Sequence, residues 1–136
     1  MIENRLIIRV RDIMKTDFGT IDGIATVRDA LNKMKTLKTS VLIVNKRHDD
    51  DEYALINCGD IARHVLAKDK APERVNVYEI MTKPVISVHP DMDIRYCSRL
   101  FANYNLVRAP VVENKKVIGI VSPNSLVLDG LYKLTQ

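Results

Sequence analysis

The sequence predicts an α+β fold, α/β-like in its alternation of helices and strands, with two β-α-β-β-α units packed with pseudo-twofold symmetry. Three observations support this prediction. The chain has 136 residues, the usual size of one compact module. Hydrophobic residues make up 46% and charged residues 28% of it, as in globular proteins. A pattern in the first half of the chain also recurs in the second half.

The internal repeat is a whole supersecondary unit. Ile13-Met14 recurs as Ile80-Met81, and the helical pattern that begins at Val27 recurs from Ile94. The matched segments are 13–14 with 80–81, 27–34 with 94–101, 41–44 with 109–112, and 54–60 with 119–125. We place the repeats at 1–70 and 71–136. Units that cannot bury an apolar face alone stack on each other, and the clefts between them are common sites for small ligands.

The first repeat contains each element in turn. Its helix has apolar residues at helical spacing, with Thr26 as the expected N-cap and Leu37 among the residues expected to face inward. Two short apolar runs rich in β-branched residues are typical of buried strands. The predicted order is a lead-in at 1–14, an irregular stretch at 15–24, a helix at 27–37, strands at 41–44 and 53–56, and a helix from 59 to about 68. The charged segment 46–52 is predicted to be a solvated hairpin loop.

The second repeat follows the same order. Pro123 suits the first turn of a helix, where its missing N–H would be unpaired. Tyr104 is expected to face inward from the long helix. The predicted elements are a lead-in at 77–81, an extended stretch at 84–90, a helix at 94–104, strands at 109–112 and 117–121 joined by a turn at 113–116, and a helix at 123–134.

Composition argues against several functional classes. No apolar run approaches the ~20 residues needed to span a bilayer, so we expect no membrane association. A net charge of +4, with no Trp and few other aromatic residues, does not indicate nucleic-acid binding. Cys58 and Cys97 lack metal-ligand spacing, so we expect no metal and a reducing, cytoplasmic location. No nucleophile and base pair is apparent, so we expect no catalytic residue and no enzyme activity.

The repeated motifs resemble those of the CBS domain, named for cystathionine β-synthase, over almost the whole chain. The resemblance rests on four motifs: the lead-ins Asp12-Ile13-Met14 and Glu79-Ile80-Met81-Thr82-Lys83-Pro84, the helix pattern Val27-x-x-Ala30-x-x-x-Met34, the strand Ala109-Pro110-Val111-Val112, and the junctions Asn57-x-x-Asp60 and Ser122-x-x-Ser125. The resemblance implies a tandem module that often dimerises and commonly binds adenine nucleotides in its clefts. It also implies regulation of a partner protein, here unidentified, with no resident cofactor.

The resemblance also implies particular ligand-binding residues. Asp60 would accept hydrogen bonds from ribose hydroxyls, with Asn57 and the helix N-terminus near the phosphate. Arg108 matches a phosphate-contacting arginine of related modules, and Val85 and Ile86 would border the base with backbone groups. Ser122 and Ser125 are the counterparts in the other cleft. A serine replaces the carboxylate there, so we expect the two clefts to differ.

Several alternatives remain open at this stage. The ligand could be AMP, ADP or ATP, or instead S-adenosylmethionine, because the ribose argument holds for any adenosine compound. The clefts could be empty, with the module acting as a homodimeric interaction scaffold. Asp60 could serve only to cap its helix, and Arg108 could pair with a carboxylate. Lys15, Arg63 and Lys83 are further candidates for contacts with phosphate.

Overall fold

The computed structural model describes residues 6–136, so the first five residues of the predicted lead-in lie outside its described part. The chain folds as two compact units, each with its own buried core. The central unit is Phe18–Val85, and the terminal unit joins the segment that ends at Asp17 to Ile86–Gln136. Each sequence repeat therefore contributes its lead-in to the unit that is built mainly by the other repeat.

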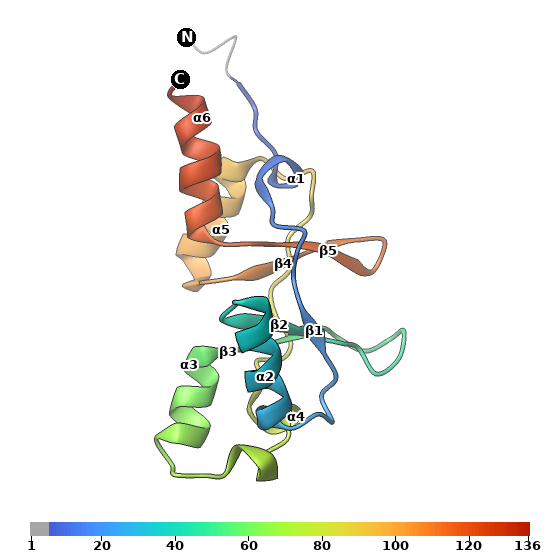
Figure 1. The fold of residues 1–136 in the computed structure, drawn as a ribbon. Coiled ribbons are helices and arrows are strands. Elements are labelled where there is room, and N and C mark those ends of the chain that lie inside the picture. The colour runs from blue at the N-terminus through green and yellow to red at the C-terminus, as the bar shows by residue number, and fades with distance from the viewer. Residues whose placement is uncertain (1–5) are drawn as a thin grey trace. The chain divides into compact units, whose positions relative to one another are not determined.

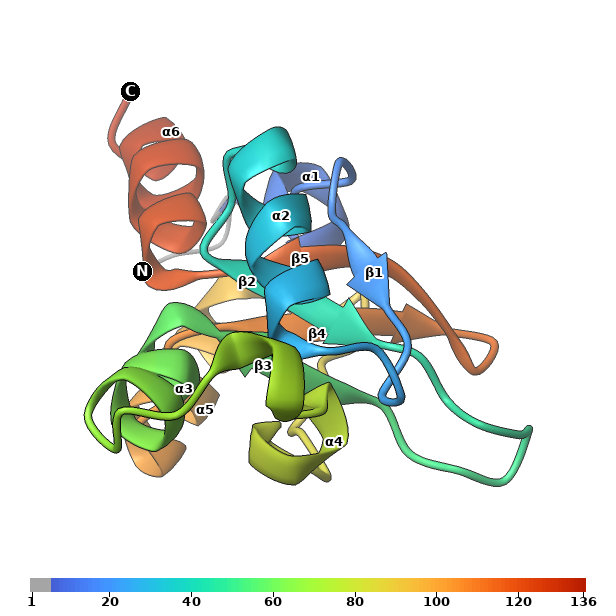
Figure 2. The same cartoon turned by 60° about the horizontal axis from the view of Figure 1, so that its bottom comes forward.

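The central unit contains a three-stranded sheet of order β1-β2-β3 (Figure 1). Strand β1 (Thr20–Ile21) is parallel to β2 (Val41–Val44), and β2 is antiparallel to β3 (Ala54–Asn57). All four residues of β2 are buried because it is the middle strand and α2 packs against it (Figure 2). The prediction that 15–24 is irregular was wrong at β1, which is only two residues long and is held by pairing with β2.

Helix α2 (Val27–Leu37) has the predicted bounds. Its N-terminus is fixed by a capping box, in which the Asp29 amide donates to Thr26 Oγ1 at 3.1 Å and the Thr26 amide donates to Asp29 Oδ2 at 3.1 Å. The apolar stripe enters the core as expected, except at Leu37, which is 48% exposed. The helix ends at Lys38, which has the left-handed conformation common at helix C-termini.

The rest of the central unit is helical. Helix α3 (Cys58–Ile61) continues as the π-helical η1 (Ala62–Leu66), and then come a 3₁₀ turn η2 (Pro72–Arg74) and α4 (Val77–Ile80). The lead-in 77–81 thus contains a helix that its sequence did not predict. Hydrogen bonds to another segment hold α4 in place: its first two amides donate to the carbonyl oxygens of Ala25 and Gly23 at 2.8 and 2.9 Å.

The terminal unit repeats this plan with a two-stranded sheet. Its elements are α1 (Val10–Ile13), α5 (Ile94–Tyr104), β4 (Ala109–Glu113), β5 (Lys116–Val121), η3 (Ser125–Leu131) and α6 (Tyr132–Leu134). The β4–β5 turn places Asn114 and Lys115 at φ of 53° and 66°, as a two-residue hairpin requires. Helix α5 has the predicted bounds, but Tyr104 is 60% exposed, contrary to expectation.

The N-terminal lead-in completes the terminal unit. Val10 is fully buried in the same core as Val88, Cys97 and Val111. Lys15 exchanges two backbone hydrogen bonds with Ile120, both of 2.9 Å. The predicted extended stretch 84–90 pairs with β4 through Val88. These contacts explain why residues far apart in the sequence fold as one unit.

Candidate functional site

The Asn57–Asp60 junction forms where β3 ends and α3 begins. Asn57 has extended backbone angles, so its side chain turns back over the first turn of the helix. The Asp60 amide donates to Asn57 Oδ1 at 2.8 Å, and the Asn57 amide donates to Asp60 Oδ2 at 3.0 Å. The two predicted residues are therefore in direct contact. Asn57, and not Asp60, is the N-cap of α3, and Asp60 at the third helical position completes a capping box with it.

A cation covers the same carboxylate. Arg63 Nη2 donates to Asp60 Oδ1 at 3.0 Å, so each carboxylate oxygen accepts one protein hydrogen bond. The Asp60 side chain is only 4% exposed, whereas that of Arg63 is 65% exposed. A Cβ at Gly59 would lie 3.2 Å from Arg63 Nη1, so the absence of a side chain there lets the guanidinium lie close to the turn. A carboxylate has about four acceptor positions, so two remain for other donors.

The equivalent junction of the second repeat is built differently. Ser125 is 3% exposed and occupies the position of Asp60. Its amide donates to Ser122 Oγ at 3.5 Å, a long hydrogen bond, and it has no carboxylate to complete a capping box. That the two clefts differ in how they bind a ligand stays a prediction.

The other predicted residues lie elsewhere in the two units. Arg108 is half-buried just before β4, and its Nη1 donates to the Val107 carbonyl at 3.2 Å. Val85 is half-buried at the end of the central unit, and Ile86 is 36% exposed at the start of the next segment. Within single units, the structure brings Asn57 to Asp60 and Ser122 to Ser125. The site that combines Asn57 and Asp60 with Arg108, and the separate site at Ser122 and Ser125, stay predictions.

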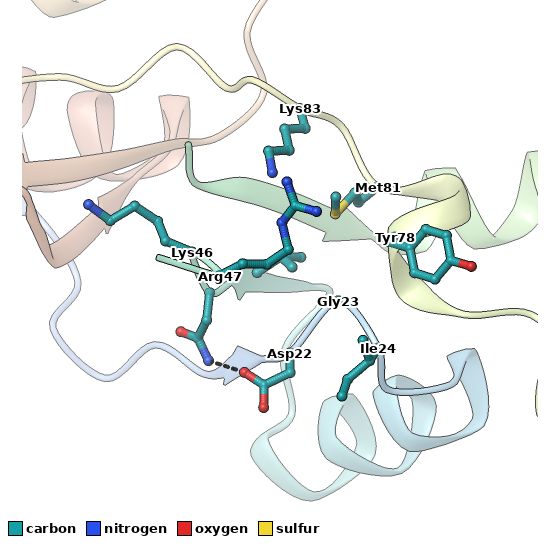
Figure 3. A pocket seen from close by; sticks show the side chains of 10 residues that line it. Asp22, Gly23, Ile24, Lys46, Arg47, Tyr78, Met81 and Lys83 are labelled. Atoms are coloured by element: carbon teal, nitrogen blue, oxygen red, sulfur yellow. Dashed lines mark hydrogen bonds between the residues drawn. The ribbon is translucent and has the colours of Figure 1, made fainter. Parts of the chain in front are cut away.

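The central unit also contains a cavity of about 600 Å³ (Figure 3). It lies at the carboxyl ends of β1 and β2, where Asp22 and Asn45 are the first residues after the strands. Asn45 Nδ2 donates to Asp22 Oδ1 at 2.9 Å. The lining residues are Asp22, Gly23, Ile24, Val44, Asn45, Lys46, Arg47, Tyr78, Met81 and Lys83.

Cationic side chains lie around this cavity, and Asp51 holds two of them. Its Oδ1 accepts from Lys83 Nζ at 2.7 Å, while its Oδ2 accepts from the Arg47 amide at 2.9 Å and from Arg47 Nε at 3.2 Å. The Lys83 hydrogen bond, followed by that of the Arg47 amide, holds the pKa of Asp51 well below its usual range. Lys46 Nζ lies 5.1 Å from the centre of the Tyr53 ring.

Sequence reasoning missed this cavity and treated 46–52 as a solvated hairpin tip. The expectation was wrong for Asp51, whose side chain is only 7% exposed. The ion pair with Lys83 joins positions 32 residues apart, so local sequence carries no signal for it. The sequence signal that could have indicated the cavity is the position of Asp22 and Asn45 directly after two strands. This signal was not usable because β1 was too short to predict.

One cluster of possible metal ligands occurs among the described residues, in the terminal unit. His89, Asp91 and Glu113 each place a ligand atom within 4.8 Å of the others. Arg11 Nη2 donates to Glu113 Oε2 at 2.7 Å and to Asp91 Oδ1 at 3.2 Å. These bonds raise the pKa of Arg11, so the arginine itself supplies the positive charge for the two carboxylates.

Comparison with known protein families matches both repeats. The family described as "CBS domain" matches residues 10–66 and again residues 77–128. The chain belongs to the CBS domain family. Its mixed helix and sheet architecture is that of a CBS domain pair, as the repeat predicted. In the described part of this CBS domain pair, no helix is both long and apolar enough to cross a membrane.

Three similar proteins place this CBS domain pair among its relatives. A homoserine O-acetyltransferase of Methanosalsum zhilinae is 33% identical over 88% of this chain, but the chain spans only 23% of that enzyme. The hexameric CBS-CP12 protein from bloom-forming cyanobacteria is 37% identical, with a TM-score of 0.89 over 94% of this chain and 71% of that one. The CBS domain pair of protein MJ0100, solved with 5′-methylthioadenosine and S-adenosyl-L-methionine, is 25% identical, with a TM-score of 0.79 over 96% of this chain and 100% of that one.

Proposed function

We propose that this CBS domain pair is a regulatory module that binds an adenine nucleotide through Asp60 and signals its presence to a partner protein. The observation that carries the proposal is the Asp60 carboxylate, which is 4% exposed at a helix N-terminus and held in position by the Asn57 amide. A fixed carboxylate suits the two neighbouring hydroxyl groups of ribose, because charge-assisted hydrogen bonds are roughly twice as strong as neutral ones.

The phosphate would be bound by donors rather than by the carboxylate. Asn57 uses Oδ1 for the Asp60 amide, which leaves its Nδ2 group as a donor toward a ligand. We propose that Arg108 contacts the same phosphate, because a guanidinium can donate two parallel hydrogen bonds to it. Backbone groups of Val85 and Ile86 would border the base. AMP, ADP and ATP all fit this scheme.

S-adenosylmethionine is a second candidate ligand of the same site. It shares the ribose and the adenine, so it would use Asp60 in the same way. The MJ0100 domain pair, solved with this compound and with 5′-methylthioadenosine, favours its inclusion. Because it lacks a phosphate, it would gain nothing from a phosphate contact with Arg108.

The proposed role is regulatory and not catalytic. The homoserine O-acetyltransferase of Methanosalsum zhilinae is about four times longer than its matched part, so we do not propose its activity for this chain. Self-association is part of the proposal, since the similar CBS-CP12 protein is hexameric. A ligand can change such an assembly only if it binds one of its states more tightly than another. A homodimeric scaffold with no ligand is the competing function.

A thermal-shift titration with AMP, ADP, ATP and S-adenosylmethionine tests the proposal. A ligand at 100 times its Kd should stabilise the wild type by about 2.7 kcal/mol, and Asp60→Ala should abolish this gain. Asp29→Ala is the matched control, because it breaks the same kind of capping box at α2 without touching the proposed site. Loss of the shift in Asp60→Ala alone supports the proposal. No shift in nucleotide-free wild type supports the scaffold.

A further inference from the structure

The cavity of the central unit lies at the opposite end of the sheet from the Asn57–Asp60 junction. In the β2–β3 pair, Val41 lies opposite Asn57 at one end and Val44 lies opposite Ala54 at the other. The two ends are three residue steps apart along the strand, which is roughly 10 Å. A molecule in the cavity therefore uses residues different from those of the proposed nucleotide site.

The cavity walls are fixed by hydrogen bonds to backbone carbonyl groups. The Asn45 amide donates to the Ile21 carbonyl at 2.9 Å, which keeps the ends of β1 and β2 together. On the other side, Asn76 Nδ2 donates to the Ile24 carbonyl at 2.8 Å, and the Tyr78 amide donates to the Gly23 carbonyl at 2.9 Å. The volume of about 600 Å³ falls within the range of small-molecule sites.

The apolar side chains that line the cavity are exposed to solvent, unlike apolar side chains in a protein core. Ile24 is 79% exposed and Tyr78 is 56% exposed, and both line the cavity. Figure 3 shows their side chains near Gly23, with Met81 farther along the same wall. An aromatic ring and two aliphatic groups on one wall suit a flat apolar body.

The charged part of the lining favours an anion. Lys46, Arg47 and Lys83 contribute three positive charges, and Asp22 is the one acid among the lining residues. Asp51 compensates one further charge and accepts from the backbone amide and from Nε of Arg47. The guanidinium of an arginine has five N–H donors. Because Asp51 accepts from Nε of Arg47, the Nη groups can donate to a second carboxylate.

We infer that this cavity is a second binding site, for a small organic anion with a flat aromatic body and one carboxylate. The body would cover Ile24 and Tyr78. The carboxylate would meet Lys46 and the Nη edge of Arg47. Lys83 holds Asp51 and thereby positions Arg47.

The test is an NMR titration of the ¹⁵N-labelled full chain with 2-naphthoate and, separately, with its neutral analogue 2-naphthamide. We expect saturable shifts confined to the amides of Gly23, Ile24, Arg47, Tyr78 and their neighbours. The carboxylate should bind at least about tenfold more tightly than the amide, the factor that one charge-assisted hydrogen bond provides.

Variants link the preference to the named residues. The double variant Lys46→Gln/Arg47→Gln should bind both compounds equally, while Lys35→Gln, which removes an exposed lysine outside the cavity, should keep the preference. Asp60→Ala should bind 2-naphthoate as the wild type does, which separates this site from the proposed nucleotide site. Equal affinity of the wild type for the two compounds, or shifts scattered over other surfaces, would overturn the inference.

Discussion

At the scale of single residues, the Asp60 carboxylate connects local structure with the proposed function. It completes a capping box with Asn57, and it also accepts from Arg63. A ligand hydroxyl that approaches Oδ1 would compete with this guanidinium. Because Arg63 is largely exposed, the competition costs little, and the displaced side chain can turn toward a phosphate.

Arg63→Ala should therefore change which adenosine compounds bind. Affinity for adenosine, which has no phosphate, should rise about two- to fivefold, the value of an exposed ion pair. The preference for AMP over adenosine should fall, because a phosphate contact is lost. Isothermal titration calorimetry measures both affinities, with Arg74→Ala as the control for loss of an exposed arginine. Weaker adenosine binding in Arg63→Ala would contradict this role.

At the scale of elements, two ion pairs fix the hairpin loop between β2 and β3, one within the loop and one to a residue far away in the sequence. Asp51 joins Lys83, beyond α4, to Arg47 within the loop. The carboxylate is stabilised in its charged form, so its pKa in the folded chain lies below that in the unfolded chain. Its contribution to stability is present above the unfolded pKa of about 3.9 and is lost as the pH falls below that value.

Asp51→Asn should lower Tm at pH 7, where the wild-type carboxylate is charged. The difference in Tm between the variant and the wild type should shrink as the pH is lowered from 4 toward 2, because the Asp51 carboxylate of the unfolded wild-type chain then takes up a proton while that of the folded chain stays charged. Thermal melts followed by circular dichroism at pH 7, 5, 4, 3 and 2 measure this difference in Tm. Asp49→Asn is the control in the same loop, since the Asp49 carbonyl, and not its carboxylate, accepts from Lys46. A Tm difference that does not change with pH would show that the charge of Asp51 is irrelevant.

Strand β5 contacts the N-terminal lead-in closely enough to require a glycine. A Cβ at Gly119 would lie 2.6 Å from Met14 Sδ and 3.0 Å from the Lys15 carbonyl oxygen. Gly119→Ala should destabilise the protein by about 1–3 kcal/mol, the usual cost of overpacking. Gly23→Ala is the control, because its nearest neighbour would be Tyr78 Cβ at 3.4 Å, an ordinary contact. Denaturant titration measures both, and equal stability of the two variants would contradict the close approach.

At the scale of the whole molecule, the compact units do not follow the sequence repeats. The N-terminal lead-in belongs to the terminal unit, and the lead-in of the second repeat belongs to the central unit. Val10 and Ile13, from the first repeat, lie in one core with Phe101 and Val121 from the second. The stability of the terminal unit therefore depends on residues of both repeats.

Val10→Ala should destabilise the terminal unit although it lies in the first repeat. Val10 is fully buried, so removing two methyl groups should cost about 2 kcal/mol. Ile7→Ala is the matched control, because Ile7 lies in the same segment and is 52% exposed. Hydrogen exchange should show faster exchange in β4 and β5 for Val10→Ala and little change for Ile7→Ala. Unchanged exchange in both strands would show that the lead-in is dispensable.

Much of the fold was predictable because long elements carry their own periodic pattern. The bounds of α2 and α5 agree with the prediction, since eleven residues at helical spacing define an apolar face. The short elements β1, α1 and α4 were missed. Two to four residues show no period, and backbone hydrogen bonds to distant segments hold them.

The candidate site was also predictable only where it depends on local sequence. The capping partnership of Asn57 and Asp60 follows from their spacing of three residues. The ion pair of Arg63 with Asp60 depends on the conformation of the arginine side chain. A spacing of three residues permits this conformation but does not require it. The cavity is lined in part by Lys83, and no local pattern in the sequence indicates that Lys83 pairs with Asp51.

The sequence by itself determined the repeat, the CBS family, the long helices and strands, and the chemical difference between the two junctions. These properties follow from residue type and spacing, which are local. The tertiary structure decided which lead-in joins which core, which charges meet Asp51 and Asp60, and where the central unit leaves a cavity. These properties depend on contacts between residues far apart in the chain, and such contacts form only when burial and hydrogen bonding are satisfied together.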